Sequence, residues 1–326
     1  EYGGMGMGFV STMLVCETIS GAVGSLSTAF GAHTGIGTMP IVLYGNEEQN
    51  KKYVPKLASG EIFGSYCLTE PTAGSDANSG KTKAVLSEDG KHYKITGQKM
   101  WISNAGFAKL FIVFARIEDD KNITAFIVPK DSDNGIKLGE EEKKLGLNSS
   151  STRQVFFTET KVPVENLLGE RNGGFKIAMK GLDGGRLNIA ACSLGTAQSA
   201  FERSVEYVGD REQFGKKIQD FQSIQFKLAD MATELEASRL MLRSAAVKVD
   251  ENTPDKTKSA AMAKRFVTDL GFKIVNEALQ IHGGYGYLKD YPLERNLRDV
   301  RVHQILEGTN EIMKVIISRE ILKENK

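Results

Sequence analysis

The spacing of apolar and polar residues changes twice along the chain. Residues 1–64 place short apolar segments between Gly and Ser, and the polar run Asn46–Gln49 is a typical start for a helix. This first stretch therefore predicts helices joined by turns. In residues 65–165, the runs Lys109–Ile117 and Ile123–Val128 are rich in β-branched and aromatic residues, which predicts short strands.

The last part of the chain has the spacing of long helices. The predicted turns of the β-rich stretch lie at Gly90, at Gly97 and across Asp131–Gly135, and after Gly173 the pattern becomes helical. One apolar stripe has successive spacings of 3, 4, 3, 4 and 7 residues and comprises Phe221, Ile224, Leu228, Met231, Leu235 and Leu242.

Three further helices are expected beside that stripe, over 175–207, over about 255–281 and from Thr309 onward. Pro254 fits the first turn of the second of these, and Gly283 with Gly284 fits its end. Four such helices can pack as a bundle.

The chain is therefore expected to have an α+β fold of three domains: an N-terminal helical domain over 1–64, a middle β domain (a small barrel or sandwich) over 65–165, and a C-terminal four-helix bundle over 166–326. Strands and helices do not alternate along the chain, which disfavours a doubly wound parallel sheet.

Composition and charge exclude several classes of partner. The 326 residues hold 42 Lys and Arg against 41 Asp and Glu, so a broad nucleic-acid or membrane-surface footprint is not expected. The 3 Cys and 4 His are scattered, which predicts neither a disulfide framework nor a metal site. Residues 18–46 carry no formal charge, but their Gly, Ser and Thr content indicates buried helices rather than a membrane span.

One segment imitates a phosphate-binding loop. Gly74 and Gly80 precede Lys81 and Thr82, but five residues separate the glycines where the loop motif has four. The segment also lies in the β-rich stretch, with no helical pattern after it. ATP hydrolysis is thus kept only as a competing hypothesis.

Two polar segments of the β domain could serve a ligand or only the fold. Residues 66–76 run from an apolar strand into a Gly-containing turn, whose backbone N–H groups and hydroxyls suit phosphate or a ring edge. Trp101, beside Ser103, could stack on a planar cofactor. The alternatives are a plain strand and turn, and a core tryptophan.

Two further segments belong to the helical part. Arg211–Gly215, followed by Gln222, puts a cation, an aromatic ring and an amide at a helix break, which suits a pyrophosphate and an adenine. Glu307 stands beside apolar residues, where burial would raise its pKa toward that of a general base, and Gly308 admits a ligand close to the backbone. The alternatives are a surface Arg at a capped helix end and an ordinary helix-start Glu.

Six motifs in chain order resemble the acyl-CoA dehydrogenase family, especially members acting on short and branched short acyl chains. They are YCLTEPTAGSD at 66–76, WIS at 101–103, GLDGGR at 181–186, REQFG at 211–215, QIHGGYGY at 280–287 and EGTNE at 307–311. The resemblance covers the whole chain and implies the helix, β and helix-bundle layout expected above. Members usually carry several more helices before the segment that matches Glu1, which leads us to expect that this chain begins within the first domain.

The resemblance implies an oxidoreductase that holds FAD, forms a homotetramer (a dimer of dimers) and converts an acyl-CoA to the 2-enoyl-CoA. Electrons would pass to electron-transferring flavoprotein, in fatty acid oxidation or branched-chain amino acid catabolism. The location would be the mitochondrial matrix in a eukaryote and the cytoplasm in a bacterium, with no nucleic-acid or membrane partner. An acyl-CoA oxidase, or a non-catalytic binding protein of the same fold, is the alternative.

The resemblance also assigns roles to residues. Glu307 would remove the α-proton while the β-hydride passes to flavin N5, and its backbone N–H, with a flavin ribityl hydroxyl, would polarise the thioester carbonyl. The expected cofactor contacts are Tyr66, Leu68, Thr69, Gly74, Ser75, Trp101, Ser103, Arg211, Phe214, Gln222, Gln280, Ile281, Gly283, Gly284, Thr309 and Glu311. The expected substrate contacts are Ser75, Asp183, Arg186 and Gly308.

Subunit sharing and substrate class follow from the same resemblance. A neighbouring subunit would supply the cofactor contacts made by Arg211, Phe214, Gln222 and residues 280–284. Some relatives carry the base just before the Arg of the GLDGGR-like segment, but here that position is Gly185, so Glu307 is favoured. No Lys or Arg lies between Glu17 and Lys51 to hold a distal carboxylate, so a dicarboxylyl substrate is disfavoured.

Overall fold

The computed structural model describes residues 1–131 and 134–323, which divide into two compact units. The β unit comprises Glu1–Gly6, Ala29–Lys143 and Ser149–Gly185. The helical unit comprises Met7–Thr28, Lys144–Asn148 and the chain from Arg186 onward. In the described residues, no helix combines the length and apolarity that crossing a bilayer requires.

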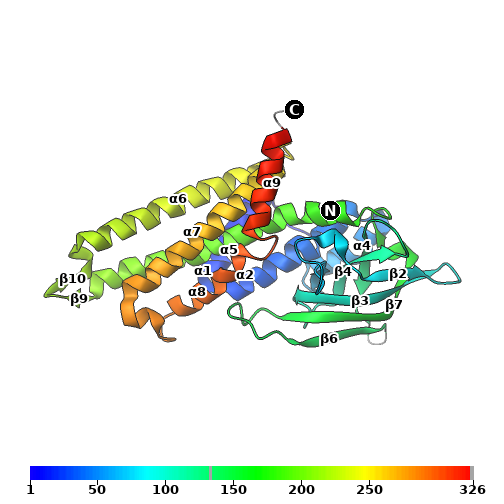
Figure 1. Cartoon of the computed structure of the whole chain (residues 1–326), viewed down its shortest axis with the longest axis horizontal. Coiled ribbons are helices and arrows are strands. Elements are labelled where there is room, and N and C mark those ends of the chain that lie inside the picture. The colour runs from blue at the N-terminus through cyan, green and yellow to red at the C-terminus, as the bar shows by residue number, and fades with distance from the viewer. Residues whose placement is uncertain (132–133, 324–326) are drawn as a thin grey trace. The chain divides into compact units, whose positions relative to one another are not determined.

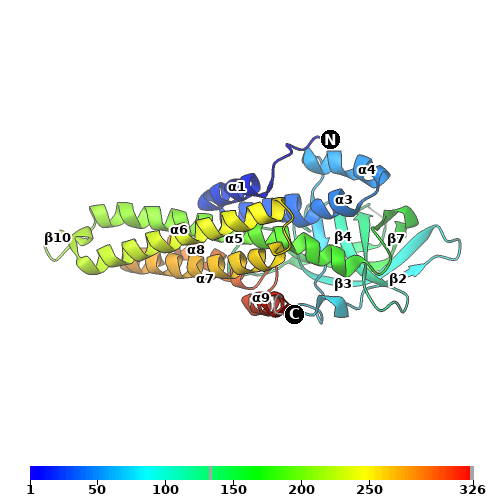
Figure 2. The same ribbon diagram turned by 90° about the horizontal axis from the view of Figure 1, so that it is seen from above.

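Long helices make up the helical unit, where α6 packs along α7 and α1 packs on α6 (Figures 1 and 2). Its helices are α1 (Phe9–Ala22), α5 from Arg186 on (Gly174–Asp210 in full), α6 (Gln222–Asp250), α7 (Lys256–His282), α8 (Leu293–Arg301) and α9 (Asn310–Lys323), with 3-10 turns η4 (Ile218–Asp220), η5 (Gly283–Tyr287) and η6 (Val302–Gln304). The predicted helices are therefore present, and α8 was not predicted.

The apolar stripe explains why α6 lies where it does. Its members Met231, Leu235 and Leu242 are buried, which removes one face of α6 from water. At the end of α7, Gly283 adopts φ 58, a left-handed conformation that stops the helix as predicted. Pro254 lies before the N-cap residue Asp255 instead of in the first turn of α7, so that detail of the prediction was wrong.

The β unit is a sheet with helices on one face. Its helices are η1 (a π-helix, Ala32–Gly37), α3 (Met39–Tyr44), α4 (Glu47–Ala58), the start of α5, and the short η2 (Ala77–Ser79) and η3 (Val164–Asn166); α2 (Gly24–Gly31) runs from one unit into the other. At the start of α4, the Asn46 side chain accepts a hydrogen bond from the Gln49 backbone N–H, and the Gln49 side chain accepts one from the Asn46 backbone N–H. This capping box confirms the helix signal in the sequence.

Eight strands of the described residues form one sheet in the order β6-β7-β3-β2-β4-β5-β8, with β1 pairing parallel to β4. They are β1 (Gly64–Cys67), β2 (Lys83–Leu86), β3 (His92–Ser103), β4 (Leu110–Ile117), β5 (Thr124–Pro129), β6 (Ile136–Glu141), β7 (Thr152–Pro163) and β8 (Leu167–Leu168). The two β-rich runs of the sequence thus correspond to β4 and β5.

The predicted turns have different outcomes. Gly90 stands in the turn before β3, with φ 68. Gly97 lies inside β3 at a break in the register with β7, so the prediction of a turn there was wrong. A Cβ at Gly97 would come 2.5 Å from Thr82 Oγ1, and this close approach explains the glycine. The predicted turn across 131–135 lies partly outside the described residues.

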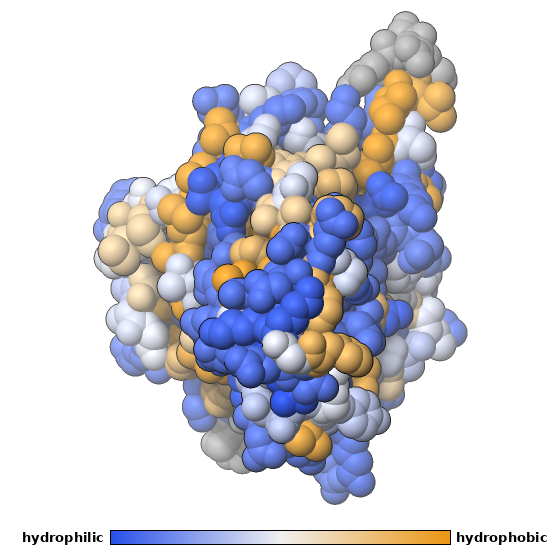
Figure 3. Space-filling model, turned by 90° about the vertical axis from the view of Figure 1, so that its left-hand side faces the viewer, coloured by the Kyte–Doolittle hydropathy of each residue, from blue (hydrophilic) through white to orange (hydrophobic). Residues whose placement is uncertain are grey.

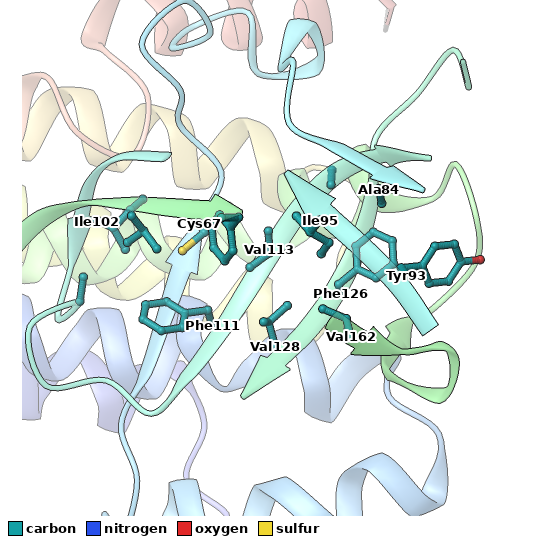
Figure 4. Close-up of a cluster of buried hydrophobic side chains, with 14 of the residues drawn as sticks. Cys67, Ala84, Tyr93, Ile95, Ile102, Phe111, Val113, Phe126, Val128 and Val162 are labelled. Atoms are coloured by element: carbon teal, nitrogen blue, oxygen red, sulfur yellow. The ribbon is translucent and has the colours of Figure 1, made fainter. Parts of the chain in front are cut away.

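Strand β4 is buried on both faces, which explains its unbroken apolar run. Phe111 and Val113 contribute to one core cluster, together with Ile95 and Phe126 (Figure 4). The alternate residues of β4 contribute to a second cluster, against side chains of α3, α4 and the start of α5. The two core clusters include residues at the end of β1 and at the end of β3, so they hold the ends of these two strands in place.

Candidate functional site

Glu307 stands on a strained turn between η6 and α9. Its φ is 57 and that of Gly308 is 92, so both residues occupy left-handed backbone. The residue is partly exposed, but its carboxylate Oε2 is buried without a hydrogen-bond partner among the described residues. Burial raises the pKa of Glu307 to about 7, against the opposing effect of the cations Arg186 and Lys264. A carboxylate poised near neutrality can accept a proton.

The surroundings of Glu307 contain a buried lysine that the sequence analysis missed. Lys264 of α7 is fully buried, and its Nζ donates to the Gly308 carbonyl and to Asn310 Oδ1, at 2.8 Å each. Arg186 of α5 is also buried. The only sequence signal for Lys264 was its position between apolar residues of a predicted helix, among Ala260, Ala261, Ala263 and Val267.

His303 is not an alternative base in this region. It is fully buried, and neither ring nitrogen has a hydrogen-bond partner among the described residues. Burial, reinforced by Lys264, lowers the pKa of His303 to about 3, so the ring stays neutral at physiological pH. With a pKa this low, His303 is too weak a base for proton transfer near pH 7.

The two residues after Gly308 that the sequence analysis assigned to the cofactor have a visible structural role at the start of α9. Thr309 Oγ1 accepts from the Ile312 backbone N–H at 3.3 Å, and the Thr309 carbonyl accepts from the Met313 N–H at 2.9 Å. Glu311 is exposed in the first turn of α9. Their assignment to the cofactor stays a prediction.

In the β unit, the loop after β1 meets the end of β3. The Met100 backbone N–H donates to the Thr69 carbonyl at 2.9 Å, and Ser65 Oγ donates to the Ser103 carbonyl at 2.7 Å. Trp101 sits at a bulge of β3 with φ 55, and its side chain is exposed. The structure therefore brings the segments carrying Thr69, Trp101 and Ser103 together, and it rules out the core-tryptophan alternative.

Gly74 and Ser75 are exposed in the same loop, and a Cβ on Gly74 would meet nothing within 4 Å. That open backbone suits a ligand that packs closely against it. Tyr66 and Leu68 are buried, and the Tyr66 hydroxyl donates to the Ala178 carbonyl at 3.3 Å. Their predicted contact with a cofactor is not tested by this geometry.

A buried ion pair holds this loop, and the sequence analysis missed it. Lys99 Nζ lies 2.7 Å from Glu70 Oε1 and also donates to the Leu68 carbonyl at 3.2 Å. The Glu70 carboxylate accepts further hydrogen bonds from the backbone N–H groups of Lys81 and Thr82. We call this cluster the Glu70–Lys99 clamp. Because Tyr93, Ile95 and Lys99 share the inward face of β3, the two-residue period of the strand was the available signal.

The segment that resembles a phosphate-binding loop is bound to the clamp. The Lys81 and Thr82 N–H groups, which would face a phosphate in such a loop, point at Glu70, and a Cβ on Gly80 would lie 2.9 Å from Glu70 Oε1. Strand β2 follows at Lys83, where the motif requires a helix. The ATPase hypothesis has no support in this geometry.

The motif at 211–215 forms the tip of a hairpin between α5 and α6. Strand β9 (Glu212–Gln213) pairs with β10 (Lys216–Lys217), and the two residues between them have φ 55 at Phe214 and φ 76 at Gly215. Positive φ at both central residues is typical of the tight turn that joins two strands. The turn leaves the Phe214 ring 93% exposed.

An open pocket of about 810 Å³ lies next to this hairpin, within the helical unit. The predicted cofactor residues among its lining are Arg211, Phe214, Ile281, Gly283 and Gly284. The end of the unit that carries β9 and β10 shows hydrophobic patches between hydrophilic ones (Figure 3).

The pocket has groups suited to an anionic aromatic ligand. The Arg211 guanidinium lies 5.4 Å from the centroid of the Tyr285 ring, so a cation and aromatic faces are presented together. A Cβ on Gly283 or Gly284 would meet nothing within 4 Å, which leaves their backbone open to a ligand. Gln222 and Gln280 are exposed beside these segments but do not line the pocket.

The predicted residues thus form three groups. Thr69, Gly74, Ser75, Trp101 and Ser103 gather in the β unit, where Asp183 is also buried on α5. The second group surrounds the pocket beside β9 and β10. The third centres on Glu307, with Arg186 and Gly308, in the helical unit. Among the described residues, no cluster of His, Cys, Asp and Glu is placed to hold a metal ion.

Comparison with known proteins covers nearly the whole chain. Models of the acyl-CoA dehydrogenase family match residues 1–61 as the N-terminal domain, 65–160 as the middle domain and 172–322 as the C-terminal domain. Mitochondrial isobutyryl-CoA dehydrogenase of Dictyostelium discoideum is 45% identical over 328 residues, which span 100% of this chain and 78% of that protein. An acyl-CoA dehydrogenase of Bacillus subtilis is 46% identical over 99% of this chain and 85% of its own length.

Solved structures agree with these relatives. Butyryl-CoA dehydrogenase from Megasphaera elsdenii has a TM-score of 0.95 at 41% identity, covering 98% of this chain and 85% of that chain. Acyl-CoA dehydrogenase from Bacillus anthracis, complexed with FAD, has a TM-score of 0.95 at 40% identity, covering 99% and 58%. A chain described as electron transferring flavoprotein of Acidaminococcus fermentans has a TM-score of 0.95 at 42% identity, covering 98% and 84%.

Proposed function

The chain belongs to the acyl-CoA dehydrogenase family, and we propose that it oxidises a short or branched short-chain acyl-CoA to the 2-enoyl-CoA with Glu307 as the base. The observation that carries the proposal is the buried carboxyl of Glu307. Its pKa is raised to about 7, it stands on left-handed backbone, and Arg186 and Lys264 balance its charge. Relatives that act on isobutyryl-CoA and butyryl-CoA support the substrate class.

The residues of the chain fit FAD as the cofactor. Trp101 offers an exposed indole face, Gly74 offers open backbone, and Ser75 is an exposed residue whose hydroxyl can donate to phosphate. We assign flavin and phosphate contacts to Tyr66, Leu68, Thr69, Gly74, Ser75, Trp101, Ser103, Thr309 and Glu311. Bound FAD would supply the acceptor for the hydride that leaves the β-carbon.

In the proposed reaction, Glu307 is the residue that removes a proton from the substrate. Its carboxylate takes the α-proton of the acyl group, and the bonding pair of the C–H bond moves toward the α,β-bond as the hydride leaves the β-carbon. The α-proton is only weakly acidic, so the thioester carbonyl must be polarised, and we assign the Glu307 backbone N–H to that role. Gly308 leaves room for the thioester beside it, because it carries no side chain.

We assign recognition of the CoA part to Ser75, Asp183 and Arg186. Arg186 is a buried cation next to the Glu307 region, and cations suit the anionic groups of CoA. Ser75 is exposed on the loop after β1 and can donate a hydroxyl. Both types of group bind phosphate or amide oxygens, so the donor chemistry supports this assignment.

We propose that the pocket beside β9 and β10 receives the cofactor of a second subunit in a homotetramer, a dimer of dimers. The contacts assigned to it are Arg211, Phe214, Gln222, Gln280, Ile281, Gly283 and Gly284. A phenylalanine that is 93% exposed, an arginine and open glycine backbone at one pocket support this assignment. Light scattering should give a native mass of four chains, and a flavin-loaded monomer would contradict the proposal.

The electron acceptor and the cellular role are proposals as well. Similarity to a chain described as electron transferring flavoprotein supports a flavoprotein acceptor. Isobutyryl-CoA dehydrogenases among the relatives support a role in branched-chain amino acid catabolism, beside fatty acid oxidation. Eukaryotic relatives are mitochondrial and others are bacterial, so the proposed location is the mitochondrial matrix or the bacterial cytoplasm, according to the source.

A panel of acyl-CoA esters tests the proposed function. Flavin-loaded protein should lose its yellow colour anaerobically with butyryl- or isobutyryl-CoA, and far more slowly with glutaryl-CoA, because residues 18–50 contain no Lys or Arg to hold a second carboxylate. Fast reoxidation of the reduced protein by oxygen would favour the oxidase alternative. Failure of every four- and five-carbon acyl-CoA to bleach the flavin would overturn the proposal.

A further inference from the structure

We propose that Lys264 is a positioning residue for the base: its ammonium group fixes the turn that presents Glu307 and keeps the Glu307 carboxylate ionised. This inference rests on the proposed function, in which Glu307 accepts the α-proton. Lys264 belongs to α7, Glu307 precedes α9, and 42 residues separate them in sequence. Neither the six motifs nor the assigned contacts include this lysine.

The geometry ties Lys264 to the backbone next to the base. Nζ donates to the Gly308 carbonyl at 2.8 Å, so the peptide that follows Glu307 is held by a charge-assisted hydrogen bond. Nζ also donates to Asn310 Oδ1 at 2.8 Å, which fixes the first residue of α9. A single buried side chain therefore holds both ends of the short segment 308–310.

A second layer of hydrogen bonds keeps Asn310 in place. Its Nδ2 donates to Asp269 Oδ1 at 2.7 Å and to Thr268 Oγ1 at 3.0 Å. Both partners lie on α7, on the same helix as Lys264. The acceptor of the lysine is thereby fixed, so Nζ has a defined position relative to Gly308.

The turn needs such a support, because its backbone is strained. A non-glycine residue in the left-handed region costs on the order of 1 kcal/mol and persists where the surroundings over-determine it. Glu307 has φ 57 and Gly308 has φ 92. A hydrogen bond to the Gly308 carbonyl is well placed to hold this conformation.

The charge of Lys264 also acts on the Glu307 carboxyl. Burial raises the pKa of Glu307, and the ammonium of Lys264 and the guanidinium of Arg186 oppose that rise. Burial in turn lowers the pKa of Lys264 to about 8. The titratable and charged groups that act on these two side chains come from α5, α7, η6 and α9, and are Arg186, Cys192, Asp269, His303 and Glu311.

The sign of the effect of Lys264 follows from these charges. Without the ammonium group, burial of the Glu307 carboxyl is opposed by one cation fewer, so its pKa must rise. The base would then stay protonated, and inactive, through neutral pH and above it. The acid limb of the rate of flavin reduction should therefore move to higher pH.

Lys264→Met removes the charge and the hydrogen bonds, and Lys264→Gln removes the charge but keeps an amide donor. We expect both variants to move the acid limb of the reduction rate upward by about one pH unit. The rate at high pH should recover more fully in Lys264→Gln, because its amide can still support the turn, and the acyl-CoA dissociation constant should change less than threefold in either variant. Lys273→Met is the matched control, since Lys273 lies on the same helix with its side chain 56% exposed.

An infrared titration of the Glu307 carboxyl, obtained as the difference from Glu307→Gln, gives the same pKa without turnover. If both Lys264 variants fail to fold, the wild-type Nζ resonance of Lys264 serves instead, and it should shift with the Glu307 titration and lose that shift in Glu307→Gln. An unchanged acid limb in folded Lys264 variants, or a lysine resonance that ignores Glu307, overturns the inference. Full activity of Glu307→Gln would instead overturn the proposed function.

Discussion

Three side chains that we assign to the site stand on left-handed backbone. Trp101 and Phe214 have φ 55, and Glu307 has φ 57. None is Gly or Asn, the residues that adopt this conformation most readily, so each costs energy that the fold must supply elsewhere. In two of the three cases, the indole of Trp101 and the phenyl ring of Phe214, the side chain is also exposed and so available to a ligand.

The raised pKa of Glu307 predicts how its replacement changes stability with pH. A carboxyl whose pKa goes from 4.5 to about 7 on folding stabilises the folded state fully below pH 4.5 and loses that contribution as pH rises through 7. Glu307→Gln imitates the protonated carboxyl at every pH. The variant should therefore gain stability relative to wild type between pH 5 and pH 8, by at most about 3 kcal/mol.

Thermal unfolding of both proteins without acyl-CoA measures this difference. The melting temperature of Glu307→Gln minus that of wild type should grow by a few degrees from pH 5 to pH 8. Glu320→Gln, a change at a half-buried side chain on α9, should show no such trend. A constant difference across this range would mean that the Glu307 carboxyl titrates at its ordinary pKa.

At the scale of elements, the Glu70–Lys99 clamp joins the loop after β1 to β3 and to the start of β2. The side chains of Glu70 and Lys99 are 4% and 1% exposed, so removal of one partner would leave the other charge buried, unpaired and without contact to solvent. Lys99→Met should cost about 3–5 kcal/mol of unfolding free energy, and the double variant with Glu70→Gln should recover part of it. Lys94→Met on the same strand, whose ion pair is exposed, should cost less than about 1 kcal/mol.

Denaturant unfolding checks these values, and flavin content checks the consequence for the site. Since the clamp fixes the loop that carries Gly74 and Ser75, Lys99→Met should also lose flavin on gel filtration while Lys94→Met retains it. Equal stabilities of the two single variants would show that the clamp does not hold the loop.

The elements with long periodic patterns were predictable, and the polar contacts between them were not. The stripe on α6 and the apolar runs of β4 and β5 can be recognised in the sequence, because burial of a whole face imposes a repeat on it. The bulge at Gly97 could not be recognised in this way, because a glycine can indicate either a turn or a close approach of another part of the backbone. The hydrogen-bond partners of Lys99 and Lys264 lie far from them in the sequence, on other elements. The local pattern of apolar and polar residues contains no information about such contacts.

At the scale of the whole molecule, the residues of the predicted site belong to two compact units. Local patterns predicted the kinds of element in each, but the grouping of distant motifs into one site came from the family resemblance. The structure supports each group separately, through the loop held by the clamp, the pocket beside β9 and β10, and the turn of Glu307. The predicted boundaries of three domains stay a prediction.

We propose above that Glu307 is the base with which this chain acts as an acyl-CoA dehydrogenase. The rate of anaerobic flavin reduction by butyryl- or isobutyryl-CoA, measured by stopped flow for flavin-loaded wild type and Glu307→Gln, tests that claim. We predict that the variant binds the acyl-CoA with similar affinity and reduces its flavin at least about 100-fold more slowly. Reduction of the variant flavin at a rate close to that of wild type would contradict the claim and place the base on another residue.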